Sequence, residues 1–546
     1  MLTLRGIRFF ASVAPRREWV SRPPRPDWES RPSDLIKAVA FLRKHKRSLQ
    51  QAELDRLFVL ISDSELVGGS KERELSLTLN LLLSPGNFRP GITLERIRPV
   101  CDRLVGDDML SLQGVNQILG AFARLKTKRS ETDLSTDFCS KILKFFISKH
   151  VSSCPNRELV NIFWAANVLR LNDDDLRPII ERKLSSFECH DIANICAGIM
   201  DDPAHPSWPA VRQDLLGRKR FSEKAIGLIM CNLACAGVND RELILHLSSV
   251  IHRTELLTIE NVSAVVWAIA TCDLVDFKMI DKAVSLLQEQ GHLITDPMDV
   301  RRISRGFAVP GQLKRIESWI MDKVLSAQSS KDKMADTLLI WELVTCGLQD
   351  SALKLFRSRP FSYWNNQIKE HDTAASQLYH LYLGSLVRDN LDLTEKSFLE
   401  SLRPRFAMLT DDMSSSVLHR QASDAVQDLK YQHVSEYQEP VSGYVVDIYI
   451  PSLNVAVEVQ GPTHFVTDLE TGAAILRQPD RFKEQVISNV AGLRVVHATP
   501  YNFGPKVKVR NELLMKALIE NRPVPSGGFE GQKRAKRKSK KIEVSS

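Results

Sequence analysis

One helical pattern that returns along the chain limits the fold more than any other feature of the sequence. Between residues 115 and 344, seven segments place mostly apolar residues at positions i, i+3, i+4 and i+7, the spacing of one helix face. Successive segments are about 37 residues apart, within the range of paired-helix repeats. The pattern therefore predicts a repeat array. The third position of each segment is Leu119, Phe163, Cys196, Met230, Val266, Ser304 or Trp341.

The stretches between these segments predict a second helix in each repeat. Several segments end in a polar turn, such as 237–240, and another amphipathic stretch follows, such as 242–253. Because a helix pair of this size cannot bury its apolar face alone, neighbouring pairs must stack. We therefore predict a mostly α-helical protein, with an α-solenoid over residues 33–350 and a helical connector over residues 351–430.

The pattern changes from helix to strand near the C-terminal end. Residues 445–450 are rich in β-branched side chains, Pro-Ser forms a turn at 451–452, and apolar residues alternate at 453–459. This predicts a hairpin with Asp447 in its first strand and Glu458 near the end of its second, broken by Gly461-Pro462 just before His464. Since burying unpaired acids in an apolar sheet is costly, we expect both carboxylates to meet a cation, a donor or water.

Asp447 and three downstream stretches together resemble a known module. The stretches are AVEVQGPTHF at 456–465, TGAAILR at 471–477 and LRVVHATPYNF at 493–503, in this order and over about a tenth of the chain. They resemble the RAP domain, a short C-terminal module of organellar RNA-metabolism proteins that include the FAST kinase-like family. The helical repeats resemble the octotricopeptide-type and FAST kinase-type arrays that precede it. The resemblance implies a small α/β module over residues 431–520 with a PD-(D/E)xK endonuclease-like fold.

The resemblance also implies roles for four residues of this module. In such nucleases two acids bind Mg²⁺ and orient an attacking water, and Asp447 and Glu458 occupy their positions. Gln460 stands where these nucleases have lysine, and glutamine carries no charge and cannot act as a base. His464 is a candidate to replace that lysine as general base or ligand, or else caps the turn or contacts a phosphate.

Three interpretations of the module therefore stay open. We favour an RNA-binding module with a degenerate site, which needs no cofactor. The second is an active endoribonuclease that uses Asp447, Glu458, Gln460 and His464 as catalytic residues, with Mg²⁺ bound by Asp447 and Glu458. The third is a protein–protein scaffold. The basic residues predicted to contact RNA phosphates are Arg477, Arg481, Lys483, Lys506, Lys508 and Arg510.

The two ends of the chain are strongly basic. Residues 1–26 hold six arginines, no lysine and one acid, with apolar residues between the arginines, which is typical of a mitochondrial presequence. A disordered basic arm is the alternative. Residues 521–546 predict a disordered basic tail, which also resembles a nuclear localisation signal and so competes with the presequence interpretation. Because the ends account for the net charge of +8, an RNA surface on the body must be a local patch.

These features lead to one functional prediction. We expect a protein of the mitochondrial matrix that binds organellar rRNA or mRNA and acts in rRNA processing, RNA stability or mitoribosome assembly, with mitoribosomal proteins as further partners. No stretch reaches the roughly 18 uninterrupted apolar residues of a membrane span, so no membrane partner is expected. No small-molecule substrate is expected either.

Overall fold

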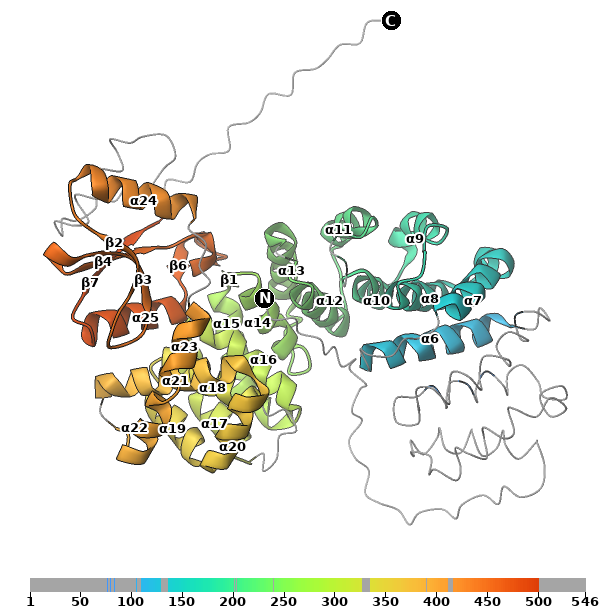
Figure 1. The fold of residues 1–546 in the computed structure, drawn as a ribbon. Coiled ribbons are helices and arrows are strands. Elements are labelled where there is room, and N and C mark those ends of the chain that lie inside the picture. The colour runs from blue at the N-terminus through green and yellow to red at the C-terminus, as the bar shows by residue number, and fades with distance from the viewer. Residues whose placement is uncertain are drawn as a thin grey trace, which may run out of the picture. The chain divides into compact units, whose positions relative to one another are not determined.

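The structure is a computed structural model, and its described residues form a mostly helical chain with a small sheet region near the C-terminal end (Figure 1). This confirms the predicted fold class at that level. The described residues are 110–499 apart from 129–135, 201, 203, 239, 327–333, 389 and 411–415, together with Ser76, Leu79, Leu83 and Val105.

Several predictions fall outside this range. The presequence at 1–26, the basic tail at 521–546 and the candidate RNA contacts Lys506, Lys508 and Arg510 lie outside the described residues. Within the described part, no helix combines the length and the apolar character needed to cross a membrane.

The chain divides into two compact units, which are described separately. The first runs to Gly306 and includes the short segment Leu469–Thr471, and the second comprises Phe307–Asp468 and the chain from Gly472 onward.

Alternate helices of the first unit contact one another in order along the chain: α6 contacts α8, α8 contacts α10, α10 contacts α12, and α12 contacts α14. The first five apolar segments lie in these five helices, and the third position of each is buried. The apolar pattern therefore identifies the side of each helix that packs against the neighbouring helices. The helices are α6 (Leu112–Lys128), α7 (Thr136–Lys149), α8 (Asn156–Leu169), α9 (Arg177–Lys183), α10 (Cys189–Ile199), α11 (Trp208–Gly217), α12 (Glu223–Cys235), α13 (Arg241–Thr254), α14 (Val262–Thr271), α15 (Phe277–Gln290) and α16 (Pro297–Ala308).

Polar residues just before several of these helices fix where each helix begins. The side chains of Ser222, Asp240 and Asp276 accept hydrogen bonds from backbone N–H groups in the first turns of α12, α13 and α15. Such caps satisfy donors that have no partner within the helix. The predicted polar turns are thus helix starts as well as connections.

The second unit begins with further helices. The helix at Met334–Thr345 holds the seventh apolar segment, and the helices after it lack the 37-residue period. Trp364 and Tyr379 are fully buried in the core of this unit. Trp364 stacks on Phe356 with 5.4 Å between the ring centroids, and its indole donates a hydrogen bond to the Phe356 carbonyl at 3.1 Å. The helices are α17 (Glu317–Ser326), α18 (Met334–Thr345), α19 (Gln349–Arg357), α20 (Phe361–Glu370), α21 (Asp372–Arg388), α22 (Leu393–Glu400) and α23 (Arg403–Thr410).

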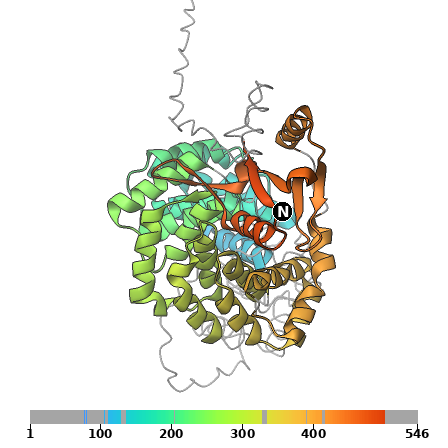
Figure 2. The ribbon, with the colours of Figure 1, turned by 90° about the vertical axis from the view of Figure 1, so that its left-hand side faces the viewer.

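The α/β module, defined here as residues 417–498, ends the described chain. Its sheet has the strand order β2-β3-β4-β7, in which the first two pairings are antiparallel and the last is parallel. Helix α24 covers one face of this sheet and α25 the other (Figure 1), and Figure 2 shows the orange and red strands together. The elements are α24 (Val417–Asp428), β2 (Val434–Gln438), β3 (Val445–Ile450), β4 (Val455–Val459), α25 (Gln478–Asn489) and β7 (Arg494–Ala498).

The predicted hairpin is confirmed as β3 and β4, joined by a short 3-10 turn at Pro451–Leu453 and by Asn454 in the left-handed conformation. One face of this hairpin is apolar. Ile448, Ile450 and Val457 pack against Ala422 and Val426 of α24. A second hairpin, β5 (Phe465–Asp468) and β6 (Ala474–Leu476), lies between β4 and α25 in the chain.

Candidate functional site

The sheet register aligns the two predicted acids. Ile448 pairs with Val457 across β3 and β4, so the next position places Asp447 opposite Glu458. Glu458 in turn pairs with His497 of β7. Residues that lie opposite one another on adjacent strands are close neighbours, so the fold brings the two carboxylates together in the middle of the sheet.

Asp447 lies where the two strands of the hairpin part. Its Oδ2 accepts a hydrogen bond from the backbone N–H of Val459 at 2.6 Å, which is a bond that a backbone carbonyl would otherwise accept. The residue is only 9% exposed. The contact holds this buried carboxylate in a fixed orientation, with its second oxygen, Oδ1, turned to other partners.

Glu458 is buried and forms an ion pair with a lysine from another element. Its Oε2 lies 2.7 Å from Nζ of Lys483, which belongs to α25. Burial raises the pKa of Glu458 to about 7, although the Lys483 ammonium opposes the shift. Burial lowers the pKa of Lys483, but the charges of Glu458 and Asp447 outweigh it and leave that pKa above its ordinary value.

Two acceptor oxygens beside this pair are buried without a hydrogen-bond partner among the described residues. They are Oε1 of Glu458 and Oε1 of Gln460, and the two residues are 4% and 3% exposed. The backbone N–H of Gln460 donates to Ala498 at 2.9 Å, so β7 fixes its position. Buried oxygens that lack donors are the ligands that a hard divalent cation takes, and the residues therefore fit Mg²⁺.

A second polar group lies around the start of α25. Nδ1 of His464 lies 2.9 Å from Oδ1 of Asp480, and this hydrogen bond raises the pKa of His464. The backbone N–H of Arg477 donates to the His464 carbonyl at 2.9 Å, because the β5–β6 hairpin returns the chain to this point. Arg477 immediately precedes α25, and Arg481 is exposed on its first turns. We call His464, Arg477 and Arg481 the anion corner. The backbone N–H groups of Gln478 and Asp480 at the start of α25 already donate to the carbonyls of Val309 and Arg477.

The structure thus brings together most of the predicted site. Asp447, Glu458 and Gln460 lie on adjacent stretches of the sheet, and the charges of Asp447 and Lys483 act on the pKa of His464. Lys483 was predicted as a phosphate contact, whereas its ammonium lies against Glu458.

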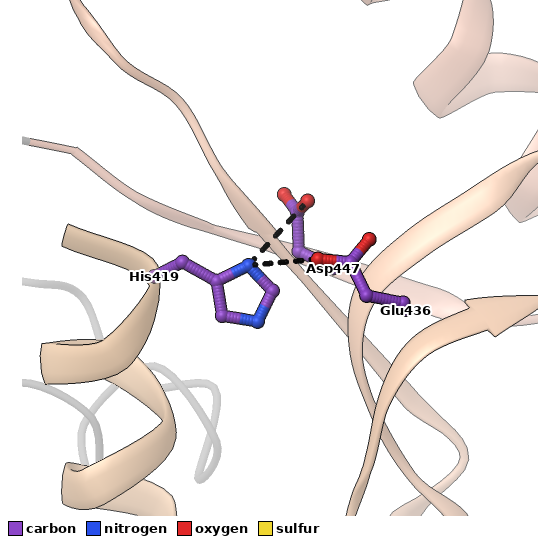
Figure 3. Close-up of side chains that lie close together, drawn as sticks. All are labelled: His419, Glu436 and Asp447. Carbon is purple, nitrogen blue, oxygen red and sulfur yellow. Dashed lines mark ion pairs between the residues drawn. The ribbon is translucent and has the colours of Figure 1, made fainter. Parts of the chain in front are cut away.

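Four other features were not predicted from the sequence: the pairing of Lys483 with Glu458, the Asp480 partner of His464, and His419 and Glu436, which lie beside Asp447 (Figure 3). The available signal for Lys483 was its place in the helix that follows the acidic strands, three residues after Asp480.

A comparison with models of known protein families found no match for this chain. A comparison with curated proteins also found none. The functional argument therefore rests on the residues and their geometry.

Proposed function

We propose that this chain is an RNA-binding protein, in which an α-solenoid is followed by a RAP-type α/β module with a PD-(D/E)xK endonuclease-like fold. The contacts between successive alternate helices of the first unit support the solenoid. The order α24-β2-β3-β4, then the β5–β6 hairpin, then α25-β7, with two antiparallel pairings and one parallel pairing in the four-stranded sheet, supports the nuclease-like core.

The anion corner is the observation that carries this proposal. Its imidazole and two guanidinium groups come from neighbouring segments of the module, and the imidazole lies close enough to Asp447 and Lys483 for their charges to act on it. Arginine side chains favour phosphate oxygens. The corner therefore suits one phosphate group of an RNA backbone.

We extend the proposal to organellar RNA on the strength of the N-terminal composition and the RAP-like residues. The protein would act in the mitochondrial matrix on rRNA or mRNA, in processing, stability or mitoribosome assembly. In that setting the helical array would hold the RNA or a ribonucleoprotein, with side chains of one face addressing unpaired bases. The module would contact the backbone.

One observation favours a second candidate, a metal-dependent endoribonuclease. Because Gln460 stands where such nucleases have lysine, the strand itself lacks a lysine beside Glu458. Lys483 of α25 takes this place and forms an ion pair with Glu458. Asp447, Glu458 and Gln460 would hold Mg²⁺, which supplies Lewis-acid activation of water and phosphate when bound. Lys483 would then orient Glu458 and neutralise charge at the attacked phosphate, and His464, held by Asp480, would bind the neighbouring phosphate oxygen.

Binding and cleavage are separated by one experiment on the purified full chain. Single-stranded RNA is titrated by fluorescence anisotropy and then incubated with Mg²⁺ or Mn²⁺. We expect Arg481→Ala to weaken binding by about tenfold at low salt and to lower the salt dependence by about one counterion, because one phosphate contact is lost. Arg420→Ala, an exposed arginine of α24, is the matched control and should bind as the wild type does.

The same assay decides between the two candidates. Binding without cleavage supports the RNA-binding protein. Cleavage that Asp447→Asn and Glu458→Gln both abolish, and that Asp424→Asn leaves intact, establishes the nuclease instead; Asp424 is an exposed acid of α24. A chain that neither binds nor cleaves RNA would contradict both and leave the scaffold interpretation.

A further inference from the structure

Three side chains of the α/β module form a compact group of metal-ligand type beside the Asp447–Glu458 pair. His419 comes from α24, Glu436 from β2 and Asp447 from β3, and one ligand atom from each lies within 4.8 Å of the other two. Nδ1 of His419 is 3.4 Å from Oε1 of Glu436 and 4.0 Å from Oδ1 of Asp447. Figure 3 shows the imidazole facing both carboxylates.

An interruption in β2 explains how Glu436 reaches this group. Val434 pairs with Tyr449, so regular alternation would put Tyr437 on the opposite face of the sheet from Tyr449. The two tyrosine rings nevertheless stack, with their centroids 4.3 Å apart. The alternation therefore reverses between them, at Glu436, whose backbone takes the left-handed φ of 52°. Oε1 of Glu436 lies 3.4 Å from Nδ1 of His419, so the side chain reaches the helix α24.

Burial and hydrogen bonding prepare the other two residues as ligands. His419 and Asp447 are 6% and 9% exposed. The N–H of Val459 binds Oδ2 of Asp447 and so leaves Oδ1 for the group. Such second contacts orient a ligating side chain before the ion arrives. Two carboxylates beside one imidazole also leave negative charge in excess, which a cation would offset, and the exposed Glu436 keeps the group open to solvent.

We propose that His419, Glu436 and Asp447 bind a divalent transition-metal ion, with Zn²⁺ as the best fit. One imidazole nitrogen and two carboxylate oxygens suit Zn²⁺ better than Mg²⁺, which prefers oxygen ligands alone. Ligands around a tetrahedral Zn²⁺ with bonds of about 2.0–2.1 Å lie about 3.4 Å apart. The His419–Glu436 separation matches that spacing, and small movements of the Asp447 carboxylate complete it.

The site differs from the cation position implied by the nuclease resemblance. That position uses Asp447 and Glu458, whereas this one uses His419 of α24 and Glu436 of the edge strand β2, and the two share only Asp447. Three protein ligands leave one position of a tetrahedral ion open to water. The ion would also tie α24 to the sheet. The inference does not depend on RNA binding, and the test below measures metal and not RNA.

The experiment is a Zn²⁺ titration of the full chain after removal of metal by a chelator, with a chromophoric chelator as competitor. We expect His419→Gln and Glu436→Gln each to weaken one equivalent of Zn²⁺ binding by at least about tenfold. His433→Gln is the matched control, because His433 belongs to the same module and bonds to Ser423 at 2.8 Å. That variant should bind as the wild type does.

Folding of each variant is checked by circular dichroism, and Glu436→Gln keeps the test valid if the buried His419 variant unfolds. Zn²⁺ should also raise the melting temperature of the wild type and not that of Glu436→Gln. Equal Zn²⁺ binding by the wild type and both ligand variants would overturn the proposal. So would loss of the site in Glu458→Gln alone, which would assign the ion to the Asp447–Glu458 pair.

Discussion

Buried acids behave differently in the two parts of the molecule. In the first unit, Asp173 bonds to His205 and Asn167, and these contacts bring its pKa below the ordinary value even though burial raises it. Asp276 caps α15 and accepts hydrogen bonds from Ser248 and His252 at 2.5 Å and 2.7 Å. In the α/β module, burial raises the pKa of Glu458 to about 7, and its Oε1 has no partner among the described residues.

The difference separates stabilising acids from candidate functional ones. The acids of the helical unit connect neighbouring repeats and satisfy helix ends, so they contribute to stability. Asp447 and Glu458 of the module are held together at a cost in stability, which is typical of sites that bind or activate something else. The following predictions test that comparison, from the largest expected effect to the smallest.

Phe163→Ala should give the largest effect, because it opens a cavity in the helical array. Phe163 is fully buried in α8, and removing such a side chain costs about 3–5 kcal/mol of unfolding free energy. Hydrogen exchange read by mass spectrometry should rise in peptides of the array and stay unchanged in those of the α/β module. Arg157→Ala, at an exposed position of the same helix, is the control. An equal rise of hydrogen exchange in the array and in the α/β module would show that the two regions unfold together, and the comparison between them would fail.

Lys483→Met should destabilise the module by about 3 kcal/mol at pH 8, because it leaves the buried Glu458 carboxylate without its cation. The loss should shrink toward pH 6, since Glu458 then takes up a proton and becomes neutral. Urea denaturation at both pH values measures it. Lys430→Met, which removes an exposed lysine of the module, should have little effect at either pH. A pH-independent loss would mean that packing and not charge is responsible.

Asp276→Ala should lower the free energy of unfolding by about 2 kcal/mol, since it removes the cap of α15 and the acceptor shared by Ser248 and His252. Asp276→Asn keeps an oxygen at the cap and should cost less than half as much. Thermal unfolding, monitored by circular dichroism, measures the stability of both variants against the wild type. If both substitutions were neutral, the acids of the array would not be stabilising, and the contrast with the module would fail.

Glu458→Gln should remove a pH dependence of stability of at most about 1.4 kcal/mol per pH unit. The folded protein keeps the Glu458 proton up to about pH 7, whereas the unfolded chain loses it near the ordinary value of 4.5. Native protein therefore binds more protons between these values, and its stability falls as pH rises through that window. The wild-type-minus-variant difference, measured by urea denaturation from pH 4 to 8, should show this fall. A flat difference would place the pKa of Glu458 near its ordinary value.

Much of the fold follows from local patterns in the sequence. The apolar spacing marked the packed sides of α6, α8, α10, α12 and α14, and the alternation at 445–459 marked β3 and β4 with their turn. Both are properties of a few consecutive residues, because helix and strand periods are fixed by backbone geometry. The alignment of Asp447 with Glu458 followed from the hairpin for the same reason.

The interaction partners of those acids could not be predicted from local sequence patterns. Lys483 is 25 residues from Glu458, and it reaches the acid only because α25 packs across the sheet before β7 joins β4 in parallel. The sequence showed that Gln460 stands at the position of the expected lysine, but no local pattern predicted that helix α25 would place a lysine beside Glu458. The role of Glu436 could not be predicted either, since its left-handed backbone interrupts the regular alternation of side chains along β2.

The sequence by itself determined which segments are helices and strands and which acids share the hairpin, since short-range periodicity and turn chemistry set these. Only the tertiary structure decided which charges meet: Lys483 with Glu458, His464 with Asp480, and His419 with Glu436 and Asp447. Such meetings depend on how separate elements pack, and packing is specified by the combined shape of many side chains and not by the residues that meet.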